Sequence, residues 1–584
     1  MPRTVILPKG SLSLHKRQAV ENDMILLIHC EGWPVIRREE IAVFNDLFFH
    51  TNRKKYAGGR RGSKDPSVSI DLDRFKKRLK ILYTHWNERK SDLWQSSHLI
   101  FMVYTPEVAE RPKSAALNLW LLGYELEDTI MVFMEKEMHI LCSTEDSSFL
   151  EALQGPARAA IGIDCLLHVK GNRADKEVVL RMMDGLMEDI SKGTAFSIPT
   201  VGHIAQEASR GWLAKAWTDK FRSLNFPLLD VASGFSDLFS VKDSGEIMNV
   251  WKAAYLTDDV MRNCMIPAIK DAVEERVSHS RLTEKARRAV SRAAFLVDAR
   301  LMMDPGSVGI CFGPIIQSGS GFDIRPGHAA SSAGLLQYGS AHAVMIALGC
   351  SYKGYCSAMV RMILFQKSPQ QAKAYKALLT GEEAVIGSLR PGVRLSTVYH
   401  AAVSAVEREA PELVPHLTET FGSSMGLEFH ESEWAIEARN ERTVRQNMVF
   451  NVYLGLQDLQ KDPKDGPTFS MVLADTVVVG GEDTTVLTPS SKLPRDVSYS
   501  LSIEVKDEEE AEAERCVALD RKEAERIPVI GEDIHKMISG ELTLDGWLDK
   551  ESLKVPKVPG SSRRRQPQNV PKGGRSSRGI SKLG

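Results

Sequence analysis

The chain has 584 residues, of which 43% are hydrophobic and 26% are charged, and its formal net charge is −1. These proportions are ordinary for soluble globular proteins and allow a sizeable core. The total charge does not indicate a nucleic-acid-binding protein, and no apolar run reaches the roughly 20 residues of a membrane helix. The eight cysteines include no Cys-x-x-Cys pair. We therefore expect reduced thiols of an intracellular protein and no zinc site.

Residues 1–67 lie before the predicted globular part of the chain and carry clusters of basic residues. The clusters are Arg37-Arg38, Arg53-Lys54-Lys55 and Arg60-Arg61. Two interpretations remain open, a solvated extension or a signal for nuclear import or nucleic-acid contact. We predict a basic, partly disordered extension over 1–67.

Residues 68–232 are predicted to form a small α/β lobe, because helical and strand-like segments are mixed there. Apolar residues recur at helical spacing from Phe75 to Trp86, which predicts a first helix with one buried face. Strands are expected at 98–104, 129–133, 138–142 and 200–204, and a further helix at 176–190.

Residues 233–500 are predicted to form a second, larger α+β lobe. The side chain of Asp243 or Ser244 can cap a helix that starts at Gly245, since its oxygen satisfies free amides of the first turn. Ser368-Pro369 opens another helix, which Pro391-Gly392 ends. The next helix is predicted over 395–407.

The composition changes after residue 500. Residues 504–514 hold seven acidic side chains and one lysine, so we interpret 501–516 as a solvated acidic linker, with attraction of basic histone surfaces as a second possibility. Residues 517–584 are predicted to be a short segment followed by a basic disordered tail. The tail from Ser552 has nine Lys or Arg and no acid. It is either an import signal or a non-specific contact for DNA phosphates.

Segments between residues 346 and 477 resemble the metal-binding segments of the pita-bread (creatinase/aminopeptidase-like) metallo-aminopeptidases. That family places two aspartates eleven residues apart in a hairpin, and the corresponding residues here are Ala347 and Ala358. Its glycine-flanked histidine corresponds to Ser423, and its two glutamates correspond to Tyr453 and Ala474.

A two-metal hydrolase needs carboxylate and imidazole ligands to hold its ions and activate water. Alanine offers no lone pair, and one serine with one tyrosine cannot replace four carboxylates and a histidine. The resemblance therefore implies a degenerate metallopeptidase fold without metal, cofactor or enzymatic activity. His430 and Glu431 are the retained fragment of peptidase chemistry, and we expect either a structural role or contacts in a peptide groove.

The chain also resembles the large subunit of the FACT histone chaperone complex, in wording close to the plant version. The similarity covers roughly residues 68–505. The matching signatures are Phe75–Trp86, Ala115–Glu125, Asp128–Phe133, Cys311–Gly319 and Gly426–Phe429.

This second resemblance implies a non-enzymatic, histone-binding subunit or paralogue of FACT that reorganises nucleosomes in transcription, DNA replication and repair. The implied location is the nucleus and chromosome, and the implied partners are core histones and nucleosomes. The small FACT subunit is a further possible partner, although no dimerisation domain is recognised. Non-specific DNA contact through the basic ends is also possible, and no membrane contact is expected.

Two alternatives compete with that interpretation. The first is a proline-directed metallo-aminopeptidase with relocated ligands, but strand alternation points Asp475 away from Ala474. The second is a non-functional truncated duplicate. Gly422–Gly426 also fits a nucleophile elbow, which needs a preceding strand and a following helix. A helix is predicted before the motif and a strand at 427–429, so we exclude the elbow.

These patterns predict that residues 68–500 fold as a stable two-lobed unit without their flanks, because periodicity is continuous there and absent outside. Limited proteolysis of the full chain should first trim both ends and leave one large fragment, identified by mass spectrometry. Early cleavage within 250–470 would contradict the domain assignment.

Overall fold

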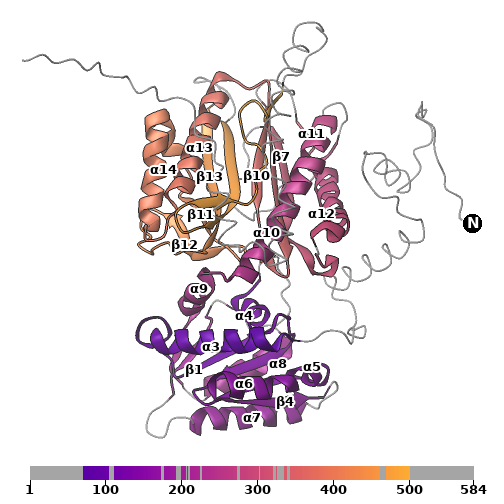
Figure 1. Cartoon of the computed structure of the whole chain (residues 1–584), viewed down its shortest axis with the longest axis vertical. Coiled ribbons are helices and arrows are strands. Elements are labelled where there is room, and N and C mark those ends of the chain that lie inside the picture. The colour runs from indigo at the N-terminus through magenta and orange to yellow at the C-terminus, as the bar shows by residue number, and fades with distance from the viewer. Residues whose placement is uncertain are drawn as a thin grey trace, which may run out of the picture.

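The computed structural model describes residues 70–499 apart from short segments at 104–110, 172–175, 193–198, 206, 208–210, 224–225, 273–276, 302, 320–323, 325–333, 338–341 and 461–467. The predictions for residues 1–67, 501–516 and 517–584 lie outside the described residues. The described chain forms two lobes stacked along the long axis (Figure 1). No helix among the described residues is long and apolar enough to cross a membrane.

The amino-terminal lobe is built on a six-stranded mixed sheet with the order β4-β3-β2-β1-β5-β6. The pairs β1–β2 and β2–β3 are antiparallel, and the pairs β3–β4, β1–β5 and β5–β6 are parallel. The strands are β1 (His98–Val103), β2 (Thr129–Phe133), β3 (Glu137–Ser143), β4 (Asp164–Lys170), β5 (Val201–His203) and β6 (Leu228–Asp230).

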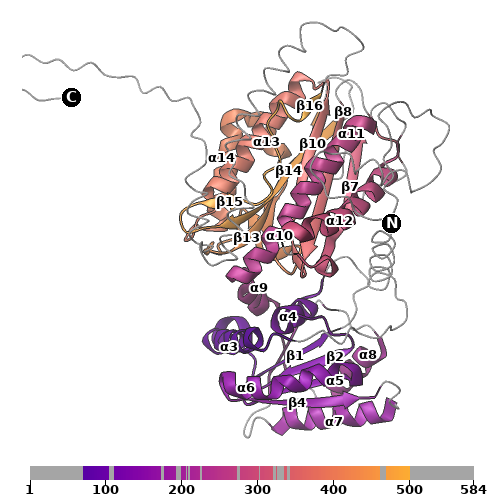
Figure 2. The same cartoon turned by 45° about the vertical axis from the view of Figure 1, so that its right-hand side comes forward.

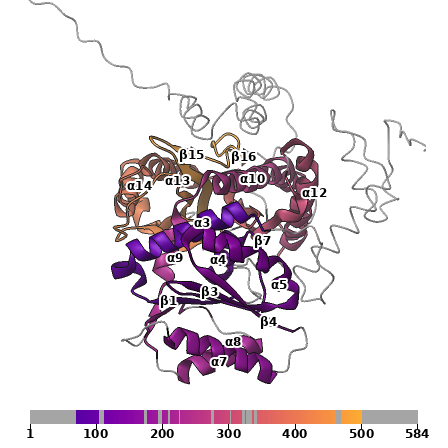
Figure 3. The same ribbon diagram turned by 60° about the horizontal axis from the view of Figure 1, so that its bottom comes forward.

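Helices cover both faces of this sheet. The helices of the lobe are α3 (Leu72–Glu88), η2 (Lys90–Trp94), α4 (Lys113–Leu122), α5 (Thr144–Leu150), η3 (Glu151–Leu153), α6 (Gln154–Ile161), α7 (Lys176–Lys192) and α8 (Gly211–Ser223). Helices α7 and α8 lie on the face away from the second lobe, while α3 and α4 lie between the sheet and that lobe (Figures 1 and 3). The apolar residues that predicted the first helix are all buried on α3, namely Phe75, Leu79, Leu82 and Trp86.

The second lobe is built on a ten-stranded sheet with the main order β12-β11-β13-β14-β10-β8-β7. Strand β9 pairs with β8, β15 pairs with β14, and β16 pairs with β10. The strands are β7 (Val308–Gly319), β8 (His342–Tyr352), β9 (Tyr355–Cys356), β10 (Met359–Phe365), β11 (Thr420–Ser424), β12 (Glu431–Glu437), β13 (Val449–Gln460), β14 (Thr468–Val479), β15 (Thr484–Val486) and β16 (Ser498–Tyr499).

Two groups of helices pack on this sheet. Helices α10 and α12 pack on β8 and β7, while α13 and α14 pack on β13, β14 and β12 (Figures 1 and 2). The helices are α9 (Ala232–Ser240), α10 (Ser244–Val260), η4 (Met261–Met265), α11 (Ile266–Ala272), α12 (His279–Leu301), η5 (Pro305–Ser307), α13 (Pro369–Ser388), α14 (Leu395–Glu409) and η6 (Pro411–His416). This architecture confirms the predicted fold class.

Both predicted helix starts carry complete capping boxes. The Asp243 side chain accepts a hydrogen bond from the amide of Glu246, whose carboxylate accepts one from the amide of Asp243. Ser368 and Gln371 form the same reciprocal pair at the start of α13. Each box satisfies two amides that would otherwise lack partners, which fixes where α10 and α13 begin.

A buried ion network holds the middle of the large sheet together. Arg361 on β10 contacts Asp475 on β14 at 2.7 Å, and both side chains are almost completely buried. The same guanidinium donates to the carbonyls of Ala474, Thr488 and Ser490. Lys492 bridges Asp475 and Glu382 of α13 at 2.6 Å each. Burial tends to raise the pKa of Asp475, but Arg361 and Lys492 outweigh it and keep the carboxyl ionised.

Replacing Arg361 should therefore destabilise the fold strongly. Arg361→Met leaves the Asp475 charge partly uncompensated in the core, and breaking a buried pair costs about 3–5 kcal/mol. The matched control is Arg390→Met, which breaks the exposed pair with Asp483 and should cost less than about 1 kcal/mol. Denaturant unfolding of both variants gives these free energies. Equal losses in the two variants would contradict the role given to Arg361.

Candidate functional site

Strand register brings the five degenerate metal positions together in the large sheet. Ala347 on β8 lies opposite Val360 on β10, and Val360 lies opposite Ala474 on β14. Ala474 in turn lies opposite Tyr453 on β13. Directly opposed residues share one face of a sheet. Four neighbouring strands thus present one continuous row of side chains.

The other two positions flank this row. Ala358 precedes β10 by one residue, and both its backbone amide and its carbonyl are bound by the Thr476 hydroxyl at 2.9 Å. Ser423 on β11 lies opposite Asn451 on β13, two residues from Tyr453. Ala347 and Ala358 are also close in the fold, because Ala347 pairs with Val360, two residues after Ala358.

The floor of the candidate site is filled by protein atoms. The five degenerate positions are each between 0% and 7% exposed. The Tyr453 hydroxyl donates a hydrogen bond to the carbonyl of Ile324. The Ile324 side chain also approaches Gly455 so closely that an added Cβ there would lie 2.6 Å from its methyl group. The Tyr453 phenol thus binds the backbone of Ile324.

The two candidate groove residues have different surroundings. His430 Nδ1 lies 2.6 Å from the Ser423 hydroxyl, so it is beside the degenerate row. Glu431 begins β12 and is buried, with its carboxylate 3.1 Å from Lys113 of the amino-terminal lobe. Its carboxylate therefore contacts the boundary between the lobes, while contact of either residue with a peptide stays a prediction.

The local prediction around Gly422–Gly426 was partly wrong. Residues 427–429 form bends instead of a strand, because the Gly426 amide turns back to the Glu428 carbonyl at 2.9 Å. Strand β11, not a helix, carries the first half of the motif. No helix follows it, and strand β12 comes next, so the geometry of a nucleophile elbow is not formed.

A cluster of charged residues joins the lobes next to this site. Lys113 on α4 contacts Glu428 at 2.8 Å and Glu431 at 3.1 Å. Arg111 donates to the carbonyls of Gly354 and Leu427 at 2.9 Å each. These contacts attach the amino-terminal lobe to two loops of the large sheet.

The tip of the β8–β9 hairpin requires a glycine at position 354. Lys353 and Gly354 both have positive φ, 46° and 81°, which is the requirement of a tight two-residue hairpin turn. An added Cβ on Gly354 would lie 2.1 Å from the Leu119 side chain on α4. The hairpin tip thus packs directly on the other lobe.

Two carboxyls share one lysine at this junction. Burial raises the pKa of Glu428 to about 8, the neighbouring Glu431 adds to the rise, and Lys113 opposes it. Burial alone would lower the pKa of Lys113, but Glu428 and Glu431 outweigh it and raise the value. The cluster therefore holds a proton at neutral pH as well as the lysine charge.

These junction residues were not recognised from the sequence. Lys113 and Glu428 are 315 residues apart, and a lysine in one helix gives no local sign of its distant partner. Two local signals pointed to Glu428: it lies in the Gly426–Phe429 signature and close to the His430-Glu431 pair. In the described part of the chain, no group of three His, Cys, Asp or Glu side chains is arranged to hold a metal ion.

Each lobe matches a known protein family. Residues 70–234 match the FACT complex subunit SPT16 N-terminal lobe domain, and residues 249–488 match metallopeptidase family M24. Dipeptidase PepE from Mycobacterium ulcerans shares the fold, with a TM-score of 0.55 and 17% identity over 74% of this chain and all of that one. The second lobe thus has the fold of the M24 metallopeptidases.

Similar proteins of known identity define the family more narrowly. FACT complex subunit SPT16 of Oryza sativa subsp. japonica is 41% identical over 480 residues, which cover 80% of this chain and 44% of that protein. The corresponding Arabidopsis thaliana protein is 40% identical over 456 residues, or 77% of this chain and 42% of that protein. The solved N-terminal domain of SPT16 from Cicer arietinum has 42% identity and a TM-score of 0.70, and it covers 74% of this chain and all of that domain.

The chain belongs to the FACT complex subunit SPT16 family. It spans less than half the length of these curated relatives. The resemblance inferred from the sequence signatures is confirmed.

The raised pKa of the Glu428 carboxyl predicts that the stability of the fold depends on pH. A carboxyl whose pKa is higher in the folded than in the unfolded state stabilises fully below the unfolded value, and this contribution is lost as pH rises toward about 8. Glu428→Gln removes the effect. The variant should therefore gain stability relative to the wild type between pH 6 and pH 8, by at least about 1 kcal/mol.

Denaturant unfolding at several pH values measures this difference. The matched control is Glu441→Gln, which alters an exposed carboxylate paired with Arg394, and its difference from the wild type should stay constant over the same range. A constant difference for Glu428→Gln as well would show that Glu428 is ionised in the folded protein.

Proposed function

We propose that this chain is a non-enzymatic histone-binding subunit or paralogue of the FACT complex. The observation that carries the proposal is the match to the whole solved SPT16 N-terminal domain at 42% identity, combined with alanine, serine and tyrosine at the five metal positions. In this proposal the chain acts in the nucleus and on the chromosome. Its partners are core histones and nucleosomes, in transcription, DNA replication and repair.

The physical basis is the conversion of a catalytic scaffold into a binding surface. A peptidase fold holds extended peptides. The row of side chains formed by Ala347, Ala474 and Tyr453 keeps that scaffold but offers no ligands for metal ions. Binding then depends on shape and polar contacts instead of Lewis-acid chemistry. His430, which is exposed and lies beside Ser423, is the candidate contact in this groove.

A peptidase with relocated ligands is not favoured. Asp475 is the carboxylate nearest to the lost glutamate in sequence, but Arg361 and Thr488 bind one of its oxygens and Lys492 binds the other. An aspartate engaged in this way cannot also coordinate an ion in the row on the opposite face.

We therefore expect neither bound metal nor hydrolysis. Purified full chain, incubated with Mn²⁺, Co²⁺ or Zn²⁺ and then desalted, should contain less than stoichiometric metal by mass spectrometry. It should also show no turnover of Xaa-Pro peptides, while an active M24 aminopeptidase treated in parallel serves as the positive control. Stoichiometric metal together with turnover would overturn the non-enzymatic assignment.

Histones and DNA should bind different parts of the chain. Neutralising the basic ends should weaken binding of a random-sequence duplex, and the slope of log K against log salt should become shallower by about 0.9 for each lost phosphate contact. Histone binding should change less than about twofold, since the lobes carry it in this proposal. The variant replaces Arg37, Arg38, Arg60, Arg61, Arg563, Arg564 and Arg565 by Ala.

Fluorescence anisotropy with labelled core histones and, separately, with the labelled duplex measures both effects. The opposite outcome, loss of histones with retention of DNA, would contradict the histone-binding role even though the fold assignment stands.

A further inference from the structure

Helix α12 carries an exposed stripe of positive charge. Between residues 277 and 292 the sequence has five cations and one acid. Four of the cations repeat at spacings of four, three and four residues, which places them on one side of a helix. Leu282, Ala286 and Val290 are buried on the core side. The stripe, defined as Arg281, Lys285, Arg288 and Arg292, extends over about 16 Å at 1.5 Å per residue.

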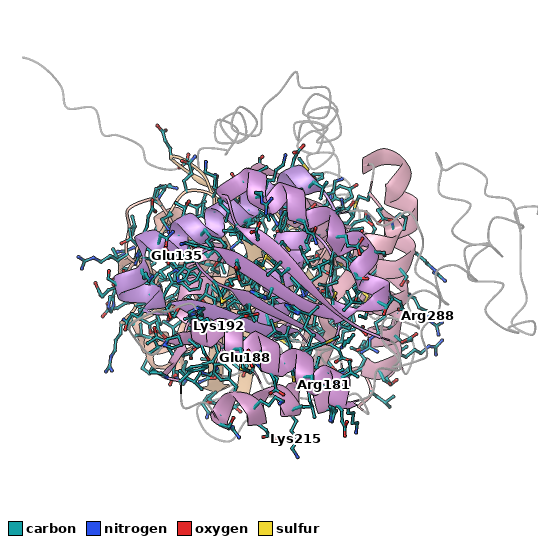
Figure 4. All side chains as sticks on the ribbon, turned by 90° about the horizontal axis from the view of Figure 1, so that it is seen from below. Glu135, Arg181, Glu188, Lys192, Lys215 and Arg288 are labelled. Carbon is teal, nitrogen blue, oxygen red and sulfur yellow. The ribbon has the colours of Figure 1, made fainter. Side chains whose placement is uncertain are left out.

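Most of this charge is not neutralised within the described residues. Arg288 contacts Glu284 at 3.1 Å. For Arg281, Lys285 and Arg292, no carboxylate partner is present in the described part of the chain. Arg288 lies at the edge of the molecule in the view from below (Figure 4). A row of like charges at this spacing repels itself, so an anionic partner would stabilise it.

The described chain ends beside helix α11, which is linked to α12 through η4. Its last described strand, β16, pairs with β10, and the ring of Tyr499 lies 4.6 Å from Lys270 Nζ on α11. Helix α11 packs on η4, and η4 packs on α12. Figure 2 shows β16 and α11 in the upper part of the second lobe, with α12 on the same side as α11 and extending below it.

The stripe lies on the side of α12 that faces η4. Burial raises the pKa of the Cys264 thiol on η4, and Lys285 and Arg292 oppose the rise, so both cations are close to η4. Arg287, which is outside the stripe, points elsewhere, because its Nη2 would lie 3.2 Å from a Cβ added to Gly313 on β7. The stripe therefore lies toward η4, the element that also packs on α11.

The sequence that follows Tyr499 has the complementary charge. Glu504, five residues after Tyr499, begins a run of seven acidic side chains that ends at Glu514. Five extended residues span at most about 17 Å, and fifteen span about 50 Å. We propose that the acidic segment Glu504–Glu514 binds the cationic stripe of α12 in the same molecule.

Tethering favours this occupant over a separate polyanion. A short linker gives the acidic segment an effective concentration in the millimolar range at the stripe. Each ion pair is exposed and individually weak, and salt screens it over a Debye length of about 8 Å at physiological ionic strength. The contact is therefore reversible and salt-sensitive. It masks both charged surfaces until a partner with higher charge density displaces one of them.

Carbodiimide cross-linking of the full chain tests the proposal, because it joins carboxylates to lysines in direct contact. Lys285 is the reporter and is kept in every protein. The stripe variant carries Arg281→Gln, Arg288→Gln and Arg292→Gln. The matched control loses the same charge from the opposite lobe through Arg181→Gln, Lys192→Gln and Lys215→Gln, which lie on α7 and α8 (Figure 4).

Mass spectrometry should find cross-links between Lys285 and the acidic segment in the monomer. Their yield, normalised to the Lys376–Glu409 pair at 2.7 Å, should fall at least about fivefold in the stripe variant and remain unchanged in the control. A rise to about 1 M salt, where the Debye length is about 3 Å, should lower the wild-type yield similarly. That salt series needs no variant and remains decisive if the stripe variant misfolds.

Three outcomes would overturn the proposal. A cross-link yield that stays at the wild-type, low-salt value both in the stripe variant and at high salt would show only the proximity of a tethered chain. Cross-links that join only light to heavy isotope-labelled copies would assign the contact to two molecules. Absence of these cross-links, with Lys285 instead protected by an added DNA duplex, would make the stripe a nucleic-acid site.

Discussion

The register of four antiparallel strands in the large sheet is the constraint on which the remaining structure depends. Strands β8, β10, β14 and β13 must align for Ala347, Ala474 and Tyr453 to form one row. A shift of one residue would move every side chain to the other face. Arg361 prevents such a shift, because its guanidinium binds Asp475 and three carbonyls of neighbouring segments on the opposite face. The row thus keeps the strand arrangement of the M24-like sheet.

Stability and chemistry are separated in this sheet. The charges that remain in its core, Arg361, Asp475, Lys492 and Glu382, bind one another. They satisfy buried groups, whereas the alanines of the row remove both ligands and charge. The tyrosine at position 453 replaces a carboxylate by a hydroxyl that binds the Ile324 carbonyl. The row of Ala347, Val360, Ala474 and Tyr453 therefore buries no isolated charge, which would be costly in this position.

Features with a local signature could be predicted from the sequence. The capping residues Asp243 and Ser368 define helix starts through contacts three residues away, and the eleven-residue spacing of Ala347 and Ala358 follows from one hairpin. Contacts between distant residues could not be predicted. Lys113 and Glu428 meet only because the lobes pack together. The cationic side of α12 was also not predicted, because the net charge of the chain does not show where the charged residues lie in the fold.

The central claim is that the peptidase-like lobes themselves, without metal, receive histones. Hydrogen–deuterium exchange of the full chain, with and without core histones and in the presence of EDTA, tests it most directly. The account predicts that histones slow exchange in peptides within residues 70–499, including those from β11 through β13 that surround Ser423 and His430. Slowed exchange confined to residues 1–67 and 500–584, with the lobes unaffected, would contradict it.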